Sequence, residues 1–213
     1  MSIGFKKILS LREVKNLVDD WLTPVDYLPY IDALLGDIDL DPCSTHLANN
    51  QFLRAKQIYT IEDDGINIEI PWTGTTYLFP PTYGRCSFSE IRGTWKWSSR
   101  AQGRSKIPSV AWFNRLEKEW KLRNVSEALF FSTNPEMIRV CPNMWKYPVC
   151  IPTKRANLVH GKDLFTLNTP FAWGFFVYLP RLDLGFNQAD KFIEIFSNIG
   201  NIIYWKGVIY IRF

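Results

Sequence analysis

The sequence has few of the residues that bind metal ions or form disulfide bonds. Only two histidines are present, His46 and His160, and they lie far apart along the chain. The four cysteines include no pair at Cys-x-x-Cys spacing. A zinc site needs several closely placed nitrogen or sulfur ligands, so we expect no metal centre. Free thiols in the cytoplasm or another reducing compartment fit this pattern better than a disulfide framework.

The chain also lacks segments that direct proteins into membranes or out of the cell. Residues 1–7 have neither a long apolar core nor a small-residue cleavage site, so we expect no secretion signal. No apolar run reaches about 18 residues, the length that crosses a bilayer, so we expect no membrane partner. Internal repeats and low-complexity tracts are absent as well. The length of 213 residues suits one domain, residues 1–213, with a full core.

Charge of one sign is only slightly in excess. The chain carries 25 Lys and Arg against 21 Asp and Glu, which gives a net charge of +4. This is a mild preference for polyanions such as nucleic acids and proves no partner. Aromatic residues, in contrast, are abundant at 15%, with nine Trp. Many belong in a core, and the surplus leaves rings that can stack on a ligand.

One stretch organises the rest of the chain. Residues 75–79 are rich in β-branched and aromatic side chains, which predicts a short strand. Pro80 and Pro81 end it, because proline donates no hydrogen bond to a sheet, and Tyr83 and Gly84 follow. Such a turn presents an aromatic ring at the sheet edge, where α/β proteins place their ligands. The alternative interpretation is a strand followed by a tight loop.

Two further strand ends carry acidic residues. Residues 37–43 alternate acidic and apolar side chains and break at a proline, which predicts a strand that presents Asp39 and Asp41. The alternative there is an Asx-turn. Residues 57–60 predict a second strand, and an acidic turn follows at residues 61–66. A carboxylate in that turn would accept hydrogen bonds from ribose hydroxyls or an amine, although acidic turns are more often simply solvated.

The remaining elements alternate between helix and strand. Thr23 is a natural N-cap, with Pro24 in the first turn of a helix that ends at Gly36. Periodicity predicts helices over residues 109–123 and 188–198 and strands over residues 126–133, 148–152, 171–179 and 201–205. Strands therefore alternate with helices first and then cluster toward the C-terminus. We predict a three-layer α/β fold whose sheet is mostly parallel with an antiparallel C-terminal edge.

A basic segment over residues 85–110 interrupts this alternation. It holds one acid, Glu90, and interleaves cations with tryptophans, serines and glycines. We predict a long inserted loop that forms a nucleic-acid groove, in which cations meet phosphates and rings stack on bases. The alternative is a solvated basic loop whose tryptophans pack onto the domain. The candidate nucleic-acid contacts are Arg85, Arg92, Trp95, Lys96, Trp97, Arg100, Arg104 and Lys106.

The three strand ends, preceded by Trp21-Leu22-Thr23-Pro24, resemble the phage-type (Dam-like) family of DNA N6-adenine methyltransferases. That family shows a Trp-x-Thr-Pro opening, an Asp-Pro-Cys or similar strand end, an Asp-Gly-Leu turn and a catalytic Asn/Asp-Pro-Pro-Tyr. The resemblance covers roughly residues 21–180, most of the chain. It implies a Rossmann-like methyltransferase sheet, S-adenosyl-L-methionine as cofactor and nucleic acid, most naturally DNA, as partner.

The resemblance also implies a cofactor site built from the first two strand ends and the segment upstream. Thr23 and Pro24 would hold the methionine end of the cofactor. Asp41 and the two residues after it would lie against it, with Asp39 as a second candidate. One acid of the turn would accept hydrogen bonds from its ribose or adenine. The implied cofactor contacts are Thr23, Pro24, Asp39, Asp41, Pro42, Cys43, Asp63 and Asp64.

The target adenine would be received by Pro80, Pro81 and Tyr83, with the tyrosine ring stacked on the base. The sulfonium of the cofactor is already activated, so the protein mainly positions the exocyclic amine in line with the methyl group. An adenine in duplex DNA must first be flipped out of the stack. The basic segment would supply the groove that holds the backbone.

The turn departs from the family pattern at one decisive position. Phe79 stands where the family has Asn or Asp, and Thr82 is inserted before Tyr83. Alignment on the tyrosine places Pro80 at the polar position instead, so either register loses the side-chain acceptor for the amine. Backbone carbonyls of the turn and the Thr82 hydroxyl are the substitutes. Two functions follow: an active DNA adenine methyltransferase, or a degenerate member that serves as a nucleic-acid-binding or assembly subunit with a protein partner.

Overall fold

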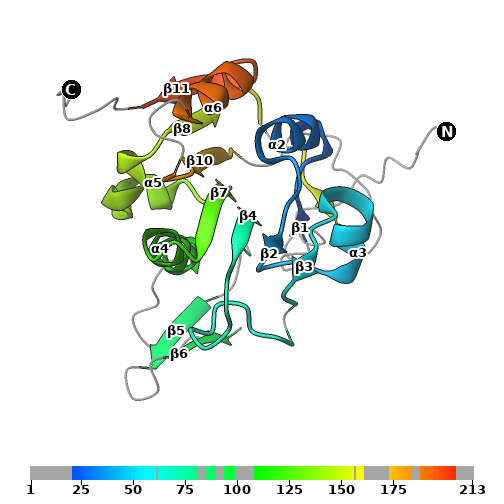
Figure 1. The fold of residues 1–213 in the computed structure, drawn as a ribbon, viewed down its shortest axis with the longest axis vertical. Helices are drawn as coiled ribbons and strands as arrows, with labels where there is room; N and C mark the ends of the chain where they lie inside the picture. Colours follow the sequence, from blue (N-terminus) through cyan, green and yellow to red (C-terminus); the bar gives the residue numbers. More distant parts are fainter. Residues whose placement is uncertain are drawn as a thin grey trace, which may run out of the picture.

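Runs of β-branched and aromatic residues form the strands of a central sheet, and helices cover both of its faces in this computed structural model (Figure 1). The structure describes residues 21–60, 62–80, 85–89, 94–98, 108–155, 157–160, 173–183 and 188–204. In the sheet, the strands follow the order β11-β8-β10-β7-β4-β2-β3. Their bounds are β2 (Leu40–Asp41), β3 (Gln57–Ile58), β4 (Gly74–Leu78), β7 (Val125–Ser132), β8 (Val149–Pro152), β10 (Phe175–Leu179) and β11 (Gly200–Ile203).

The sheet has a parallel half and an antiparallel half. Strands β3, β2, β4 and β7 pair in parallel, whereas β10 pairs antiparallel with both β7 and β8, and β11 pairs antiparallel with β8. Strand β10 thus lies between β7 and β8, although it follows both in the chain. It also follows that β8 points in the same direction as β7. The prediction of an α/β fold with a mixed sheet and an antiparallel C-terminal edge is confirmed.

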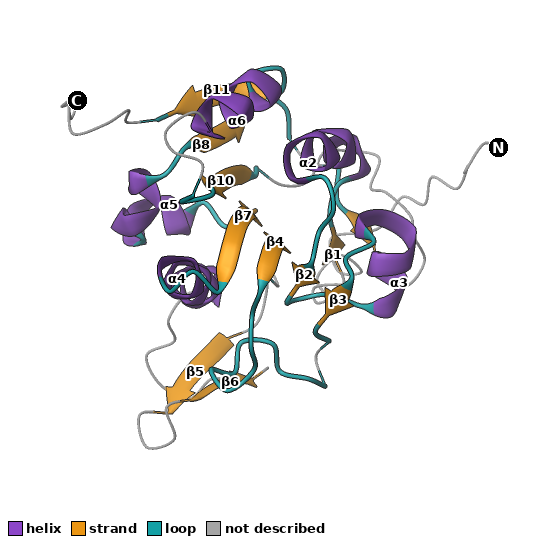
Figure 2. Ribbon diagram, viewed as in Figure 1, coloured by secondary structure: helices purple, strands orange, loops and turns teal. Residues whose placement is uncertain are grey.

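The alternation of side chains along β7 divides the core into two layers. Leu129 and Phe131 face one hydrophobic cluster, whereas Ala128 and Phe130 face the other. Helices α2 (Leu28–Leu35) and α6 (Gln188–Phe196) cover the first face, and α4 (Pro108–Lys121) with the short α5 (Glu136–Val140) covers the second (Figure 2). Smaller elements are β1 (Trp21–Leu22), η1 (Val25–Tyr27), α3 (His46–Ala48), η2 (Asn49–Leu53), η3 (Pro142–Lys146) and β9 (Val159–His160).

An aromatic cluster fills the layer beneath α2. The ring of Phe131 lies 4.5 Å from that of Phe176, 4.9 Å from that of Phe79 and 5.7 Å from that of Tyr27, between centroids. Gly174 makes room for it, since a Cβ atom there would lie 2.5 Å from the Phe131 ring. Phe131 therefore joins η1, the end of β4 and β10 in one buried unit.

Two local expectations are wrong. Thr23 does not cap the helix that follows: Pro24 occupies the N-cap position of η1, and no side chain caps that end. The segment predicted as a long loop contains two strands, β5 (Arg85–Ser89) and β6 (Thr94–Ser98), which pair antiparallel. Five residues of each strand are paired through the backbone, from Arg85 with Ser98 to Ser89 with Thr94. The helix end at Gly36, where φ is +62°, is as predicted.

Other observations concern the thiols and the helices. Among the described residues, Cys141 and Cys150 are buried and form no disulfide bond. Within the ranges that the structure describes, no helix has both the length and the apolar character needed to cross a bilayer.

Truncation of Phe131 to alanine should cost about 3–5 kcal/mol of unfolding free energy, because it removes a buried ring that three other rings contact. Urea unfolding followed by tryptophan fluorescence measures this loss. Leu122→Ala is the matched control, because Leu122 is 59% exposed and its truncation should change the stability by less than about 0.5 kcal/mol. Equal losses in the two variants would contradict the central place of Phe131.

Candidate functional site

The parallel half of the sheet gathers several chain segments at one edge. Strands β2, β3, β4 and β7 run in the same direction, and β8 shares it, so their carboxyl ends lie along a common edge. In open α/β sheets this edge is where ligands bind. The predicted cofactor residues after β2 and β3 and the predicted base turn after β4 all begin here.

Asp41 is the most unusual residue at this edge. It ends β2 and is 3% exposed, although its side chain is a carboxyl group. Its Oδ1 accepts a hydrogen bond from the Cys43 backbone N–H at 3.1 Å, which makes the Asx-turn that was the alternative interpretation of this segment. Burial raises the Asp41 pKa to about 6, and the hydrogen bond from Cys43 opposes that rise. A buried carboxyl with a raised pKa is typical of functional sites.

Thr23 connects the upstream segment to the sheet. Its hydroxyl and that of Tyr77, on β4, lie 3.0 Å apart in a buried hydrogen bond. Burial raises the Tyr77 pKa, the bond to Thr23 lowers it, and the negative charge of nearby Asp41 raises it further. Thr23 and Asp41 therefore both lie beside Tyr77, as a shared site requires. No sequence motif marks Tyr77, because it has the pattern of an ordinary strand residue.

The acidic turn after β3 lies against the end of β2. Asp63 Oδ2 accepts hydrogen bonds from the Thr60 N–H at 2.7 Å and the Thr60 hydroxyl at 2.8 Å, and the backbone bond is the main reason that the Asp63 pKa is lowered. Asp64 adopts a left-handed conformation with φ +54°. Position 65 has to be glycine, because a Cβ atom there would lie 2.1 Å from the Pro42 carbonyl oxygen and would clash with it. The structure thus brings the two predicted strand ends together, with Asp63 engaged in forming the turn.

Asp39 lies at the other end of the strands. Its carboxylate accepts hydrogen bonds from Lys56 Nζ at 2.8 Å and from the Thr75 N–H at 2.9 Å, where β4 begins. The hydrogen bond from Lys56 is the main cause of its lowered pKa. Gly74 adjoins this carboxylate, because a Cβ atom there would lie 2.4 Å from Asp39 Oδ2. Asp39 therefore lies away from the Asp41 site. It packs at the amino ends of the strands, where it binds Lys56 and the start of β4.

The predicted base turn begins inside the core. Phe79 is 8% exposed and belongs to the aromatic cluster, so its side chain faces α2 and not an open site. Pro80 is buried as well. The other predicted catalytic residues, Pro81, Thr82 and Tyr83, lie outside the described residues.

The predicted nucleic-acid contacts are described only in part. Backbone pairing places Arg85 in β5 and Trp95, Lys96 and Trp97 in β6. The remaining contacts lie outside the described residues: Arg92, Arg100, Arg104 and Lys106.

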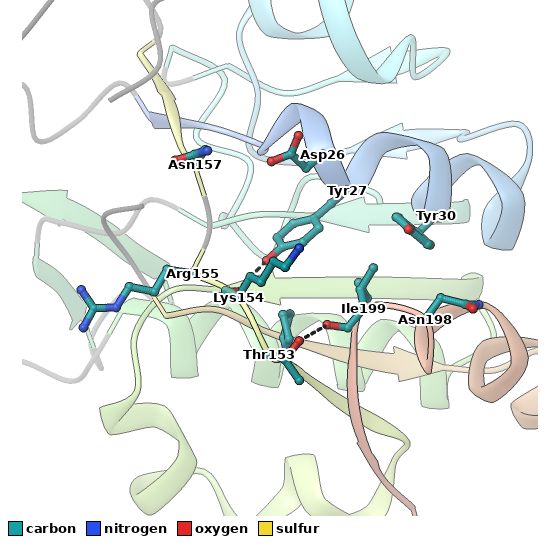
Figure 3. A pocket seen from close by; sticks show the side chains of 10 residues that line it. Asp26, Tyr27, Tyr30, Thr153, Lys154, Arg155, Asn157, Asn198 and Ile199 are labelled. Carbon is teal, nitrogen blue, oxygen red and sulfur yellow. Dashed lines mark hydrogen bonds between the residues drawn. The ribbon is translucent and has the colours of Figure 1, made fainter. Parts of the chain in front are cut away.

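A cavity of about 780 Å³ opens between η1, the segment after β8 and the turn between α6 and β11 (Figure 3). Its lining residues are Asp26, Tyr27, Tyr30, Pro152, Thr153, Lys154, Arg155, Asn157, Asn198 and Ile199. The Tyr27 hydroxyl donates to the Lys154 carbonyl at 3.5 Å across its floor. The sequence signal for it was the basic pair Lys154 and Arg155 at a strand end.

Replacement of Asp41 by asparagine should increase stability at neutral pH. Asparagine keeps the shape and the acceptor for the Cys43 N–H, while it removes the buried charge. The Asp41 pKa is about 6 in the fold against an ordinary 3.8, so the folded state holds this proton more tightly than the unfolded state. Burial of the Asp41 carboxyl therefore leaves the free energy of unfolding unchanged below about pH 3.8. The loss of stability grows between about pH 3.8 and about pH 6 and is constant at higher pH. We expect D41N to gain on the order of 3 kcal/mol over wild type at pH 7 and to match it near pH 3.5.

Urea unfolding at the two pH values makes this measurement. Asp39→Asn is the matched control, with the opposite sign: it removes the partner of Lys56 and should lower stability at pH 7. A D41N variant as stable as wild type at both pH values would show that burial does not raise the Asp41 pKa in the folded state.

Comparison with known protein families, with curated proteins and with solved structures finds no match for this chain. The family resemblance therefore stays a prediction. Function has to be inferred from the residues gathered at the carboxyl edge: Asp41, Thr23, Tyr77 and the turn at Gly65.

Proposed function

We propose that this protein is an S-adenosyl-L-methionine-dependent methyltransferase that acts on adenine N6 in DNA. The observation that carries the proposal is the buried Asp41 carboxyl at the carboxyl edge, beside the bonded pair of Thr23 and Tyr77. Asp41 and Thr23 come from segments of the sequence that resemble the methyltransferase motifs. A mixed sheet with a parallel half and an antiparallel C-terminal edge is also the fold that the resemblance implies.

The residues present suit the charge of the cofactor. S-adenosyl-L-methionine carries a positive sulfonium and a positive ammonium group, and when bound it supplies an activated methyl group for transfer to a nucleophile. Asp41 is buried and its pKa is about 6, so a cationic ligand would favour its ionised form. Thr23 and Pro24 are held next to it through Tyr77. The Gly65 turn carries Asp64 against the same strand end, where a carboxylate would accept hydrogen bonds from ribose.

The second candidate is the degenerate member of the family, and Phe79 favours it. Its ring lies 4.9 Å from that of Phe131 in the core, so the position that should hold the target amine contributes packing instead. Only backbone carbonyls of the turn and the Thr82 hydroxyl then remain as acceptors. The loss of one well-placed polar group typically lowers a rate by about 100- to 1000-fold. This form would retain cofactor or nucleic-acid binding without efficient transfer.

Cofactor affinity should depend on pH through Asp41. Below about pH 6 the cation must displace the Asp41 proton, so affinity should rise by up to about tenfold per pH unit and level off above pH 6. Isothermal titration calorimetry with S-adenosyl-L-methionine from pH 5 to pH 8 measures this. The Asp41→Asn variant should bind more weakly at pH 7 and show no such rise. Absence of binding at millimolar cofactor would rule out the methyltransferase.

Transfer of a labelled methyl group to adenine in DNA separates the two candidates. We expect the wild type to transfer slowly, and Phe79→Leu to transfer at a similar rate because leucine keeps the site apolar. Phe79→Asn places an amide in the aromatic cluster and should lose about 2–4 kcal/mol of stability. Methylation by Phe79→Asn alone would identify the natural protein as the degenerate form. Folding of each variant is checked by its thermal unfolding.

A further inference from the structure

The cavity between η1 and the end of β8 has the chemistry of a nucleic-acid site. Its lining holds two cations, Lys154 and Arg155, and one acid, Asp26, and all three are exposed. Polar groups suited to bases and sugars surround them: the Tyr27 hydroxyl, the Tyr30 ring and the amides of Asn157 and Asn198. In Figure 3, Asp26 and Lys154 lie on opposite sides of Tyr27, and Arg155 extends outward.

Two observations separate this cavity from an ordinary surface hollow. The first is that Asn157 Oδ1 is buried and has no hydrogen-bond partner within the described part of the chain. A buried acceptor without a partner costs free energy unless a ligand or water supplies a donor.

The second observation is an exposed aromatic residue beside the cations. The Arg155 guanidinium lies 5.2 Å from the centroid of the Trp173 ring, and Trp173 is 52% exposed. Trp173 shortly precedes β10 in the chain, at the edge where β8 ends. A large ring that stays half-exposed and is stacked with a guanidinium is the arrangement that proteins use to stack nucleic-acid bases.

The position of the cavity relates it to the candidate active site. Pro152 ends β8, whose carboxyl end shares an edge with that of β4. Three inter-strand steps separate β4 from β8 in the sheet, roughly 14 Å at the usual spacing. Phosphates of one B-form strand are about 3.4 Å apart along the axis, so about four nucleotides span this distance.

We propose that this cavity binds the DNA strand a few nucleotides from the target adenine, with Lys154 and Arg155 on phosphates and Trp173 stacked on a base. The inference rests on the proposed function for its choice of DNA. It adds a second binding region, distinct from the basic segment over residues 85–110. The cavity would hold the flanking strand and thereby fix which adenine reaches the turn after β4.

Fluorescence anisotropy with a labelled single-stranded oligonucleotide tests the proposal. Binding is measured between about 50 and 200 mM salt for wild type and for the double variant Lys154→Gln/Arg155→Gln. Loss of two phosphate contacts should reduce the slope of log K against log salt by about 1.4. Trp173→Ala should weaken binding by about 5- to 100-fold with little change in that slope. Thermal unfolding confirms that these exposed positions leave the fold intact.

The matched control removes two exposed cations elsewhere, Lys118→Gln/Arg123→Gln, on and just after α4. It should leave both the affinity and the slope unchanged at first order. An equal effect of the two double variants would mean that binding depends on net charge alone, and it would overturn the proposal. So would a wild type that binds no oligonucleotide, or one that binds free AMP in the cavity in preference to the strand.

The proposed DNA-binding cavity and the proposed methyltransferase can each be refuted without the other, because different measurements test them. Cofactor binding by calorimetry with no effect of Lys154→Gln/Arg155→Gln on DNA binding would refute the cavity and keep the enzyme. Oligonucleotide binding that depends on these residues, without cofactor binding, would refute the enzyme and keep the cavity.

Discussion

The contact between the rings of Phe131 and Phe79 determines what the carboxyl edge can do. Phe131 is the buried centre to which Tyr27, Phe176 and Phe79 attach, and Gly174 leaves the space for it. Because Phe79 belongs to this cluster, the position of the chain is fixed up to Pro80, the last described residue before the predicted base turn. The same contact removes the side chain of residue 79 from any site. In the proposed methyltransferase, position 79 would hold the target amine, whereas in this structure the Phe79 side chain contributes to core packing.

Asp41 has the opposite effect to Phe79, because its burial lowers the stability of the fold. A carboxyl group at a buried strand end lowers stability at neutral pH, and an apolar residue there would avoid this cost. Asp39, two residues earlier, is used for stability instead, because Lys56 and the Thr75 N–H hold its carboxylate at the amino ends of the strands. Two acids in one short segment thus have different physical roles. Proteins accept unfavourable burial of this kind mainly where a ligand later uses the charge.

Most of the fold could be predicted from the sequence. Hydrophobic periodicity indicates each helix or strand, and a proline or glycine marks where it ends. The seven strands of the central sheet and the helices α2, α4 and α6 follow these signals. Strand pairing was harder to predict: β5 and β6 pair antiparallel in a segment whose mixed charge and glycines suggested a loop.

The site was predictable only where a motif marks it. Motifs marked Asp41 and the Gly65 turn as candidates, and the structure brings them to one sheet edge. Tyr77 was missed, because its hydrogen bond joins it to a residue 54 positions away. Asp39 and Asp41 look equivalent in the sequence, since only the sheet register shows which one lies at the carboxyl end. The cavity after β8 was missed for a related reason: its three walls come from distant segments.

The insertion of β10 between β7 and β8 also sets an order of events for folding. Strand β8 leaves the ribosome before β10, yet its pairing partners β10 and β11 are synthesised later. Until residues 175–179 are available, the half-sheet of β3, β2, β4 and β7 has an open edge at β7, and β8 has no partner. Such an edge is a site for unwanted association between nascent chains. The last third of the chain thus closes the sheet and completes the edge on which the candidate site is built.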